Sequence, residues 1–354
     1  MMNIKKKIIA LISTCLLITV ALFGTKCAFE EHLVFMEDAT PVCFADSYWQ
    51  MNAIISESGN VYVRGALLSD DTTYGIPNVN EYKAQFQSLN FEKTDRFVQI
   101  YSTGDARTVM LSNNGGVIIT DNNEVFVFCE LENYRLPTFL CEDATHATLD
   151  GTKVYLLNDK GSFGYIDLSL PDDRIQVLEG IKSFCITDQD HSVWILNDKH
   201  ELWVFMGGDL SAPPVMCNTE VMDFDAASTT SYSSSEAHYR IGIVKLDGTV
   251  SVYDDWGLPS SNSTGTFTLL SVDHAPDITV YSHGVVVLDQ EGNARAFGYD
   301  LLSDRIYNGE VIIQNVCAVS AGALSINFVT KDGHHVYAGS LPSSAFVELE
   351  ELIQ

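Results

Sequence analysis

Short apolar runs alternate with tight polar turns along most of this chain. Within the runs, apolar and polar positions repeat with a period of two, and the runs end at Asp, Asn, Gly or Lys residues. This pattern is typical of β-strands joined as hairpins, whereas the spacing of an amphipathic helix is scarce. The chain is therefore predicted to be all-β.

One hairpin unit recurs seven times, over residues 54–63, 117–128, 154–166, 193–205, 241–253, 285–297 and 326–338. Its turns are marked by Gly59, Asn123, Gly161, His200, Gly248, Gly292 and Gly333, which are 64, 38, 39, 48, 44 and 41 residues apart. Gly and Asn tolerate the positive φ that tight hairpin turns require. A mean period of about 46 residues suits a four-stranded propeller blade.

These repeats predict a seven-bladed β-propeller of four-stranded antiparallel blades, forming one domain over residues 29–354. Two stacked β-sandwiches are the alternative, although separate sandwiches would not share one turn-centred period. Insertions are expected near residues 69–96 and 226–238, the second as a serine-rich surface loop. A strand from residues 32–35 or 345–349 is expected to complete a terminal blade.

Several copies resemble the repeat of the regulator-of-chromosome-condensation family. They are Ala321-Gly322 to Asp332-Gly333 to Gly339, the segment Ser58-Gly59-Asn60-Val61-Tyr62-Val63-Arg64-Gly65, and Gly292 to Gly298. The resemblance covers about residues 41–341 and implies four antiparallel strands per blade around a central channel. Exported bacterial propellers of this kind include an inhibitor of β-lactamase, so the resemblance implies a scaffold for binding proteins outside the cell.

The first 28 residues are predicted to be an export signal. Lys5, Lys6 and Lys7 precede an apolar run from Ile8 to Gly24, as in a cleaved signal peptide, with an uncleaved signal anchor as the alternative. Either interpretation predicts a secreted or cell-surface protein, which touches a membrane only through an uncleaved anchor.

The charge balance excludes one class of partner. The chain has 20 Lys and Arg against 47 Asp and Glu, a formal net charge of −27. Such a protein repels the phosphates of nucleic acids and favours a partner with a basic surface. We expect a monomer that binds another protein.

Three cysteines are predicted to occupy equivalent places in separate blades. Cys43, Cys185 and Cys317 fall 16, 15 and 16 residues before their turn residues. We expect free, buried thiols near the axis. A disulfide between Cys43 and Cys317 is the alternative, but equivalent positions in neighbouring blades normally exceed the Cα separation of roughly 7 Å that a disulfide allows.

No catalytic, metal-binding or cofactor-binding motif is found in the sequence. It lacks a nucleophile elbow, a His-Glu-x-x-His helix and a phosphate loop, and no cysteines or histidines have zinc-ligand spacing. Neighbouring carboxylates such as Asp172 and Asp173 could catalyse acid–base chemistry only if the fold brought them together across a cleft. We therefore predict no catalytic residues, no metal and no cofactor.

The loops that follow the last predicted strand of each unit should share one rim of a closed ring. They combine acidic and aromatic residues, which suit recognition of a basic partner. The predicted partner-binding residues are Asp70, Tyr74, Asp254, Asp255, Trp256, Tyr299 and Asp300. In the alternative interpretation, Trp256 and Tyr299 only fill gaps between blades.

Two classes of function remain open from sequence. The first is an exported, non-enzymatic binding protein that uses this rim. The second is a glycan-active enzyme or lyase with its site at the channel mouth, for which acids and a His or Tyr would have to converge at the axis of one face. A cell-surface adaptor held by an uncleaved anchor is a variant of the first class.

Overall fold

The computed structural model of the chain describes residues 36, 40–48, 51–65, 97–112, 115–129, 131–134, 136–170, 174–187, 189–230, 237–254, 267–281, 283–299, 306–322, 325–340 and 346–347. The predicted export signal and the insertion near residues 69–96 lie outside them. Across the described ranges, none of the helical segments has both the length and the apolar character that crossing a membrane requires.

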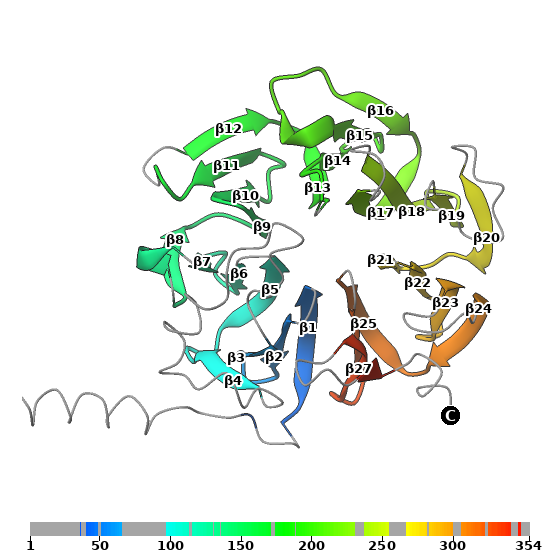
Figure 1. Cartoon of the computed structure of the whole chain (residues 1–354), viewed down its shortest axis with the longest axis horizontal. Helices are drawn as coiled ribbons and strands as arrows, with labels where there is room; N and C mark the ends of the chain where they lie inside the picture. Colours follow the sequence, from blue (N-terminus) through cyan, green and yellow to red (C-terminus); the bar gives the residue numbers. More distant parts are fainter. Residues whose placement is uncertain are drawn as a thin grey trace, which may run out of the picture.

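The strands form seven four-stranded antiparallel sheets arranged as a closed ring, with the first strand of each sheet nearest the centre (Figure 1). This confirms the predicted seven-bladed propeller. The first strands are β1 (Val42–Tyr48), β5 (Ala106–Ser112), β9 (His146–Asp150), β13 (Ile181–Ile186), β17 (Val221–Thr230), β21 (Asp277–Tyr281) and β25 (Val316–Ala321).

The other strands follow outward in chain order within each blade. The second strands are β2 (Met51–Ser56), β6 (Gly115–Thr120), β10 (Lys153–Leu157), β14 (Val193–Asn197), β18 (Ala237–Lys245), β22 (Gly284–Leu288) and β26 (Ser325–Thr330). The third strands are β3 (Val61–Gly65), β7 (Val125–Cys129), β11 (Phe163–Asp167), β15 (Leu202–Phe205), β19 (Thr249–Asp254), β23 (Ala294–Tyr299) and β27 (His335–Ser340). The fourth strands are β4 (Val98–Tyr101), β8 (Thr138–Cys141), β12 (Arg174–Leu178), β16 (Val215–Asn218), β20 (Thr268–Asp273), β24 (Ile306–Ile313) and β28 (Phe346–Val347). Short 3₁₀ turns, η4 (Glu132–Tyr134) and η5 (Met206–Gly208), follow β7 and β15.

The seven predicted hairpins are the second and third strands of the seven blades. Val154 pairs with Ile166 in blade 3, and Val285 pairs with Phe297 in blade 6. All seven predicted turn residues have a positive φ, from 63° at Asn123 and His200 to 87° at Gly248. The strand β28 completes blade 7, which agrees with the second of the two strands expected to do so.

The same hydrogen bond joins every blade to the next. The carbonyl oxygen of each turn residue accepts a backbone N–H at the start of the following blade, at distances of 2.6 to 3.2 Å. The donors are Ala106, Ala144, Ile181, Val221, His274, Val316 and Val42. The last of these bonds, from Val42 to Gly333, closes the ring between blade 7 and blade 1. We call these seven bonds the junction bonds.

A separate hydrophobic cluster fills each of the seven interfaces between neighbouring blades. The cluster between blades 2 and 3, for example, packs Val117 and Val125 against Val154 and Leu156. Because the strands of a propeller are buried on both faces, apolar side chains on each face reach one neighbour. The core is therefore a ring of clusters rather than one central mass.

The antiparallel order gives the ring two different faces. The turns between second and third strands and the passages between blades lie on one face, which we call the turn face. Connections from first to second strands and from third to fourth strands lie on the other, which we call the rim face. The loops predicted to share a rim are therefore at the same end of the ring, as expected.

The second insertion differs from its predicted bounds. Strand β17 continues to Thr230 and β18 begins at Ala237, and these two residues pair. Residues 226–230 and 237–238 are thus strand rather than loop, because the serines and threonines there alternate across a hairpin whose backbone is paired. This hairpin extends toward the rim face from blade 5.

The cysteines follow the prediction in part. All six in the described part of the chain are free: Cys43, Cys129, Cys141, Cys185, Cys217 and Cys317. Cys43 and Cys317 are exposed rather than buried, because each lies at the bulge after the first residue of its strand. Cys185 lies further along its strand than Cys43 does, since a longer connection, residues 187–192, separates β13 from β14.

Candidate functional site

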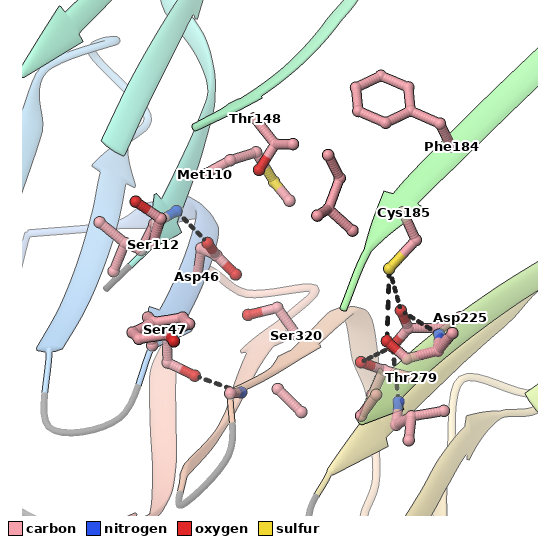
Figure 2. Close-up of a pocket in the computed structure, with 18 of the residues that line it drawn as sticks. Asp46, Ser47, Met110, Ser112, Thr148, Phe184, Cys185, Asp225, Thr279 and Ser320 are labelled. Carbon is pink, nitrogen blue, oxygen red and sulfur yellow. Dashed lines mark hydrogen bonds between the residues drawn. The ribbon is translucent and has the colours of Figure 1, made fainter. Parts of the chain in front are cut away.

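A central channel runs along the axis of the ring and encloses a cavity of about 460 Å³. Each first strand contributes one side chain to a middle ring at the same register position (Figure 2). The seven members of the middle ring are Asp46, Met110, Thr148, Cys185, Asp225, Thr279 and Ser320. Aspartate thus occupies equivalent positions in blades 1 and 5.

The two aspartates of the middle ring make the same contact. Oδ2 of Asp46 accepts the backbone N–H of Leu111 at 2.7 Å, and Oδ2 of Asp225 accepts that of Val280 at 2.7 Å. Leu111 and Val280 occupy equivalent positions on the first strands of the next blades. Each carboxylate therefore ties its blade to the following one, in addition to the junction bond.

Asp225 has further partners within the channel. Oγ1 of Thr279 donates to Oδ2 at 3.2 Å, and the thiol of Cys185 donates to Oδ1 at 3.5 Å. Burial raises the pKa of both middle-ring aspartates, to about 7 for Asp46, although backbone N–H donors oppose the shift. These side chains stabilise the ring, and their hydrogen-bonding capacity is largely used.

A second group of side chains lies in the channel two residues earlier on the first strands, nearer the turn face. It includes His146, Asp223 and Asp277, from blades 3, 5 and 6. Burial and the charge of Asp277 raise the pKa of Asp223 to about 7, while burial and Asp225 raise that of Asp277 to about 6. Burial and the nearby Arg107 lower the pKa of His146. These groups titrate closer to neutrality than free carboxyls do.

Five aspartates line the channel, the fifth being Asp150 near the rim face. Among the described residues of its wall there is no Lys or Arg, so the channel attracts cations and repels anions. Within the parts of the chain that the structure describes, no three His, Cys, Asp or Glu side chains are grouped so that they could hold a metal ion.

On the rim face, buried polar contacts hold the long hairpin of blade 5. The hydroxyl of Tyr239 donates to Asp190 of blade 4, which also accepts from Thr187 at 2.7 Å. Burial alone would raise the pKa of Asp190, but these hydrogen bonds and that of Ser192 lower it. The hairpin is therefore fixed to its neighbour by an ionised carboxylate.

The next residue of the hairpin, Arg240, joins blades 5 and 6. Its Nε and Nη2 atoms donate to Oδ2 of Asp254 at 3.1 and 2.9 Å, and Nη1 donates to the carbonyl oxygen of Tyr281 at 3.0 Å. Asp254, one of the predicted partner-binding residues, is only 3% exposed. Its carboxylate faces Arg240 rather than solvent, because the two residues are paired across β18 and β19.

The other predicted partner-binding residues stay predictions. Tyr299 ends β23 and pairs with Ile306. Asp70, Tyr74, Asp255, Trp256 and Asp300 lie outside the described residues, in the connections from third to fourth strands. Asp209, in the equivalent connection of blade 4, is exposed and accepts from the N–H and hydroxyl of Ser211.

The channel aspartates were missed by sequence analysis. The repeats were aligned on the hairpin turns, and the first strands upstream were not placed in register. Each first strand carries a bulge near its start, as between Val42 and Phe44, which shifts the register by one residue. An alignment that allowed for the bulge would have placed Asp46 and Asp225 in one column.

No protein-family model matches this chain, and no curated protein matches it in sequence. Its fold is similar to several solved structures. One is Prp20p from Saccharomyces cerevisiae, the yeast RCC1, with a TM-score of 0.56, 13% identity and 80% of each chain covered; its structure was described with its binding to Gsp1p and histones. Another is a chain of the mitotic checkpoint complex, with a TM-score of 0.52, 10% identity, and 88% of this chain and 91% of that one covered.

A third similar structure is PorZ, a bacterial surface component of the type-IX secretion system of Porphyromonas gingivalis. It has a TM-score of 0.50 and 11% identity over 89% of this chain, which spans only 39% of the PorZ chain. At such low identity, these similarities show the β-propeller fold. Membership of the regulator-of-chromosome-condensation repeat family stays a prediction from the sequence motifs.

Proposed function

We propose that this chain is an exported binding protein that holds another protein on its rim face. The observation that carries the proposal is the difference between the two faces. The turn face consists of tight turns whose carbonyls make the junction bonds, whereas the rim face carries the extended hairpin of blade 5 and the long connections 66–97 and 255–267. Propellers commonly present such connections as binding surfaces on a rigid ring.

Charge defines the kind of partner. A formal net charge of −27 favours a protein with a basic surface, and acidic side chains would steer its approach. We infer that Trp256 and Tyr299 supply aromatic anchors, surrounded by Asp70, Tyr74, Asp255 and Asp300. Asp254 would act indirectly, by holding Arg240 at the base of the hairpin.

The similar structures support a protein partner in general terms. Prp20p was described with Gsp1p and histones, and PorZ is a component of a secretion system. The apolar run of the first 28 residues supports export. Neither identifies the partner of this chain.

The test compares variants of the two faces. The chain would be immobilised and exposed to envelope and secreted proteins, with the double variant Trp256→Ala/Tyr299→Ala beside it. The control is Leu246→Ala, which removes an exposed apolar side chain from the turn face. We expect stoichiometric capture of one protein by the wild type and the control, and loss of capture by the double variant. Equal capture by all three proteins would contradict a rim-face site.

A second candidate function rests on the channel. The raised pKa values of Asp223 and Asp277, with His146 across the channel at the same level, are what a glycan-active enzyme or lyase could use for acid–base catalysis. Release of reducing ends from a panel of polysaccharides would test it. Activity that is lost in Asp223→Asn and retained in Asp209→Asn, an exposed carboxylate, would establish this candidate; no release from any polysaccharide would favour binding alone.

A further inference from the structure

The interface between blade 7 and blade 1 differs chemically from the other six, and we call it the closing interface. On the blade 1 side, Ser47, Asn52 and Arg64 lie opposite one another across β1, β2 and β3. The residues equivalent to Asn52 in the other blades are Gly116, Val154, Val193, Ile241, Val285 and Ile326. An amide thus stands only in blade 1 where the six other blades have apolar side chains or glycine.

The polar groups of the closing interface are buried. Asn52 is 0% exposed, and neither its Nδ2 nor its Oδ1 atom has a hydrogen-bond partner. On the blade 7 side, Asn327 is 1% exposed; its Oδ1 contacts Nε2 of His335 at 2.8 Å, whereas its Nδ2 has no partner. A buried polar atom without a partner destabilises the closed state relative to one in which water reaches it.

Apolar packing offsets this cost less here than elsewhere. Among the described residues, the hydrophobic cluster of the closing interface contains six buried members, against thirteen between blades 2 and 3. The remaining contacts are polar or aromatic. Ser47 Oγ accepts the N–H of Gly322 at 3.0 Å, and the guanidinium of Arg64 lies over the rings of Phe97 and Tyr337, at 4.5 and 5.0 Å from their centroids.

The junction bond at this interface is ordinary. Val42 N–H donates to Gly333 at 2.8 Å, within the range of its six counterparts. The closing interface therefore keeps the geometry of the repeat while replacing its apolar contacts with groups that water can solvate.

We propose that the ring is built to open at the closing interface before any other. Opening there separates β1 from β25 and β26, exposes Asn52 and Asn327 to water, and gives lateral access to the channel without unfolding a blade. This is a conformational device of the ring, and it does not depend on which partner the rim face holds.

The seven junction amides provide a direct test, because each reports the opening of one interface. Hydrogen exchange of the full chain would be followed at single-residue resolution for Val42 and its counterparts Ala106, Ala144, Ile181, Val221, His274 and Val316. We expect Val42 to exchange at least about tenfold faster than the slowest four of them. Exchange of Val42 at the same rate as its counterparts would overturn the proposal.

A substitution separates opening from fraying near the chain end. Asn52→Val installs the side chain found at this position in blades 3, 4 and 6, and it should slow the exchange of Val42 while leaving Ala144 unchanged. Fraying would not respond to a substitution inside the interface, so an unchanged rate at Val42 would contradict the proposal.

A chemical measurement on the unsubstituted chain does not depend on how that variant folds. Cys43 and Cys317 occupy equivalent exposed positions in blades 1 and 7, and a bifunctional thiol reagent can join them across the closing interface. Crosslinked protein should show slowed exchange at Val42. Cys317→Ser treated with the same reagent is the control, and equal rates in both would count against opening at this interface.

Discussion

Asp46 allows the physical account of the channel to be tested quantitatively. Its carboxyl is 6% exposed, and burial raises its pKa from about 3.8 to about 7. In the unfolded chain the same group ionises near 3.8, so between those two values the native state holds a proton that the unfolded state has lost. The unfolded state therefore gains stability relative to the native state as pH rises through this window.

The size of the effect follows from the width of the window. Between pH 5 and pH 8, about two pH units lie where native Asp46 is protonated and unfolded Asp46 is ionised. At about 1.4 kcal/mol per unit, Asp46 should cost the wild type about 3 kcal/mol of unfolding free energy over this range. Asp46→Asn keeps the shape and one acceptor oxygen for Leu111 but cannot titrate, so it removes this loss.

The difference between variant and wild type isolates Asp46 from other groups. Asp223 and Asp277 have raised pKa values and add to the loss of stability in both proteins. His335 acts in the opposite sense, because burial and Arg64 lower its pKa to about 3, so its contribution is lost as pH falls below about 6.5. Both contributions cancel in the comparison of the two proteins.

The assay is urea denaturation of Asp46→Asn and wild type at pH 5 and pH 8, followed by tryptophan fluorescence. We expect the variant to gain about 3 kcal/mol relative to wild type between the two values. Asp209→Asn is the control, because hydrogen bonds from Ser211 lower the pKa of Asp209 and keep it ionised across the whole range. A difference that stays flat within about 0.5 kcal/mol would refute the assignment of a raised pKa to buried Asp46.

Three further outcomes are expected. Asp254→Ala leaves a buried guanidinium without its carboxylate and should lower the unfolding free energy by about 3 kcal/mol; a loss below about 1 kcal/mol in urea denaturation would contradict the buried ion pair. Gly59→Ala brings a Cβ within 2.5 Å of the Gly104 backbone and should cost at least about 2 kcal/mol, whereas Gly151→Ala meets nothing within 4 Å and should cost about 1 kcal/mol for its positive φ; equal losses would refute the close approach. In native protein at pH 8, exposed Cys317 should be alkylated well before Cys217, whose pKa burial raises to about 11, and mass mapping of the first labelled site showing Cys217 would contradict this order.

The hairpins were predictable because their strands are apolar on both faces and their turns need special residues. The pairing of Val154 with Ile166 follows from the sequence once the turn at Gly161 is found. The first strands were harder to place, because their channel side tolerates Asp46, Met110 or Thr148 equally, and the bulge shifts their register. A side chain such as Asp46 therefore looks like surface charge until the ring encloses it.

The exposure of acidic residues was also beyond sequence. Asp254 follows an apolar strand and precedes Asp255 and Trp256, so its carboxylate resembles those of an open loop. Only the pairing of β18 with β19 places Arg240 beside it. The long hairpin of blade 5 was mistaken for a loop for a similar reason, because serines and threonines on paired strands have the composition of a flexible connection.

The junction bonds also bear on how such a ring can change during evolution. Every tight turn of the turn face is committed twice, to a positive φ and to a carbonyl that holds the next blade. An insertion there would break an interface, whereas a longer connection on the rim face leaves all seven junctions intact. New sequence can therefore accumulate on one side only, and a lineage of such propellers could diversify its recognition surface while the opposite side keeps its turns.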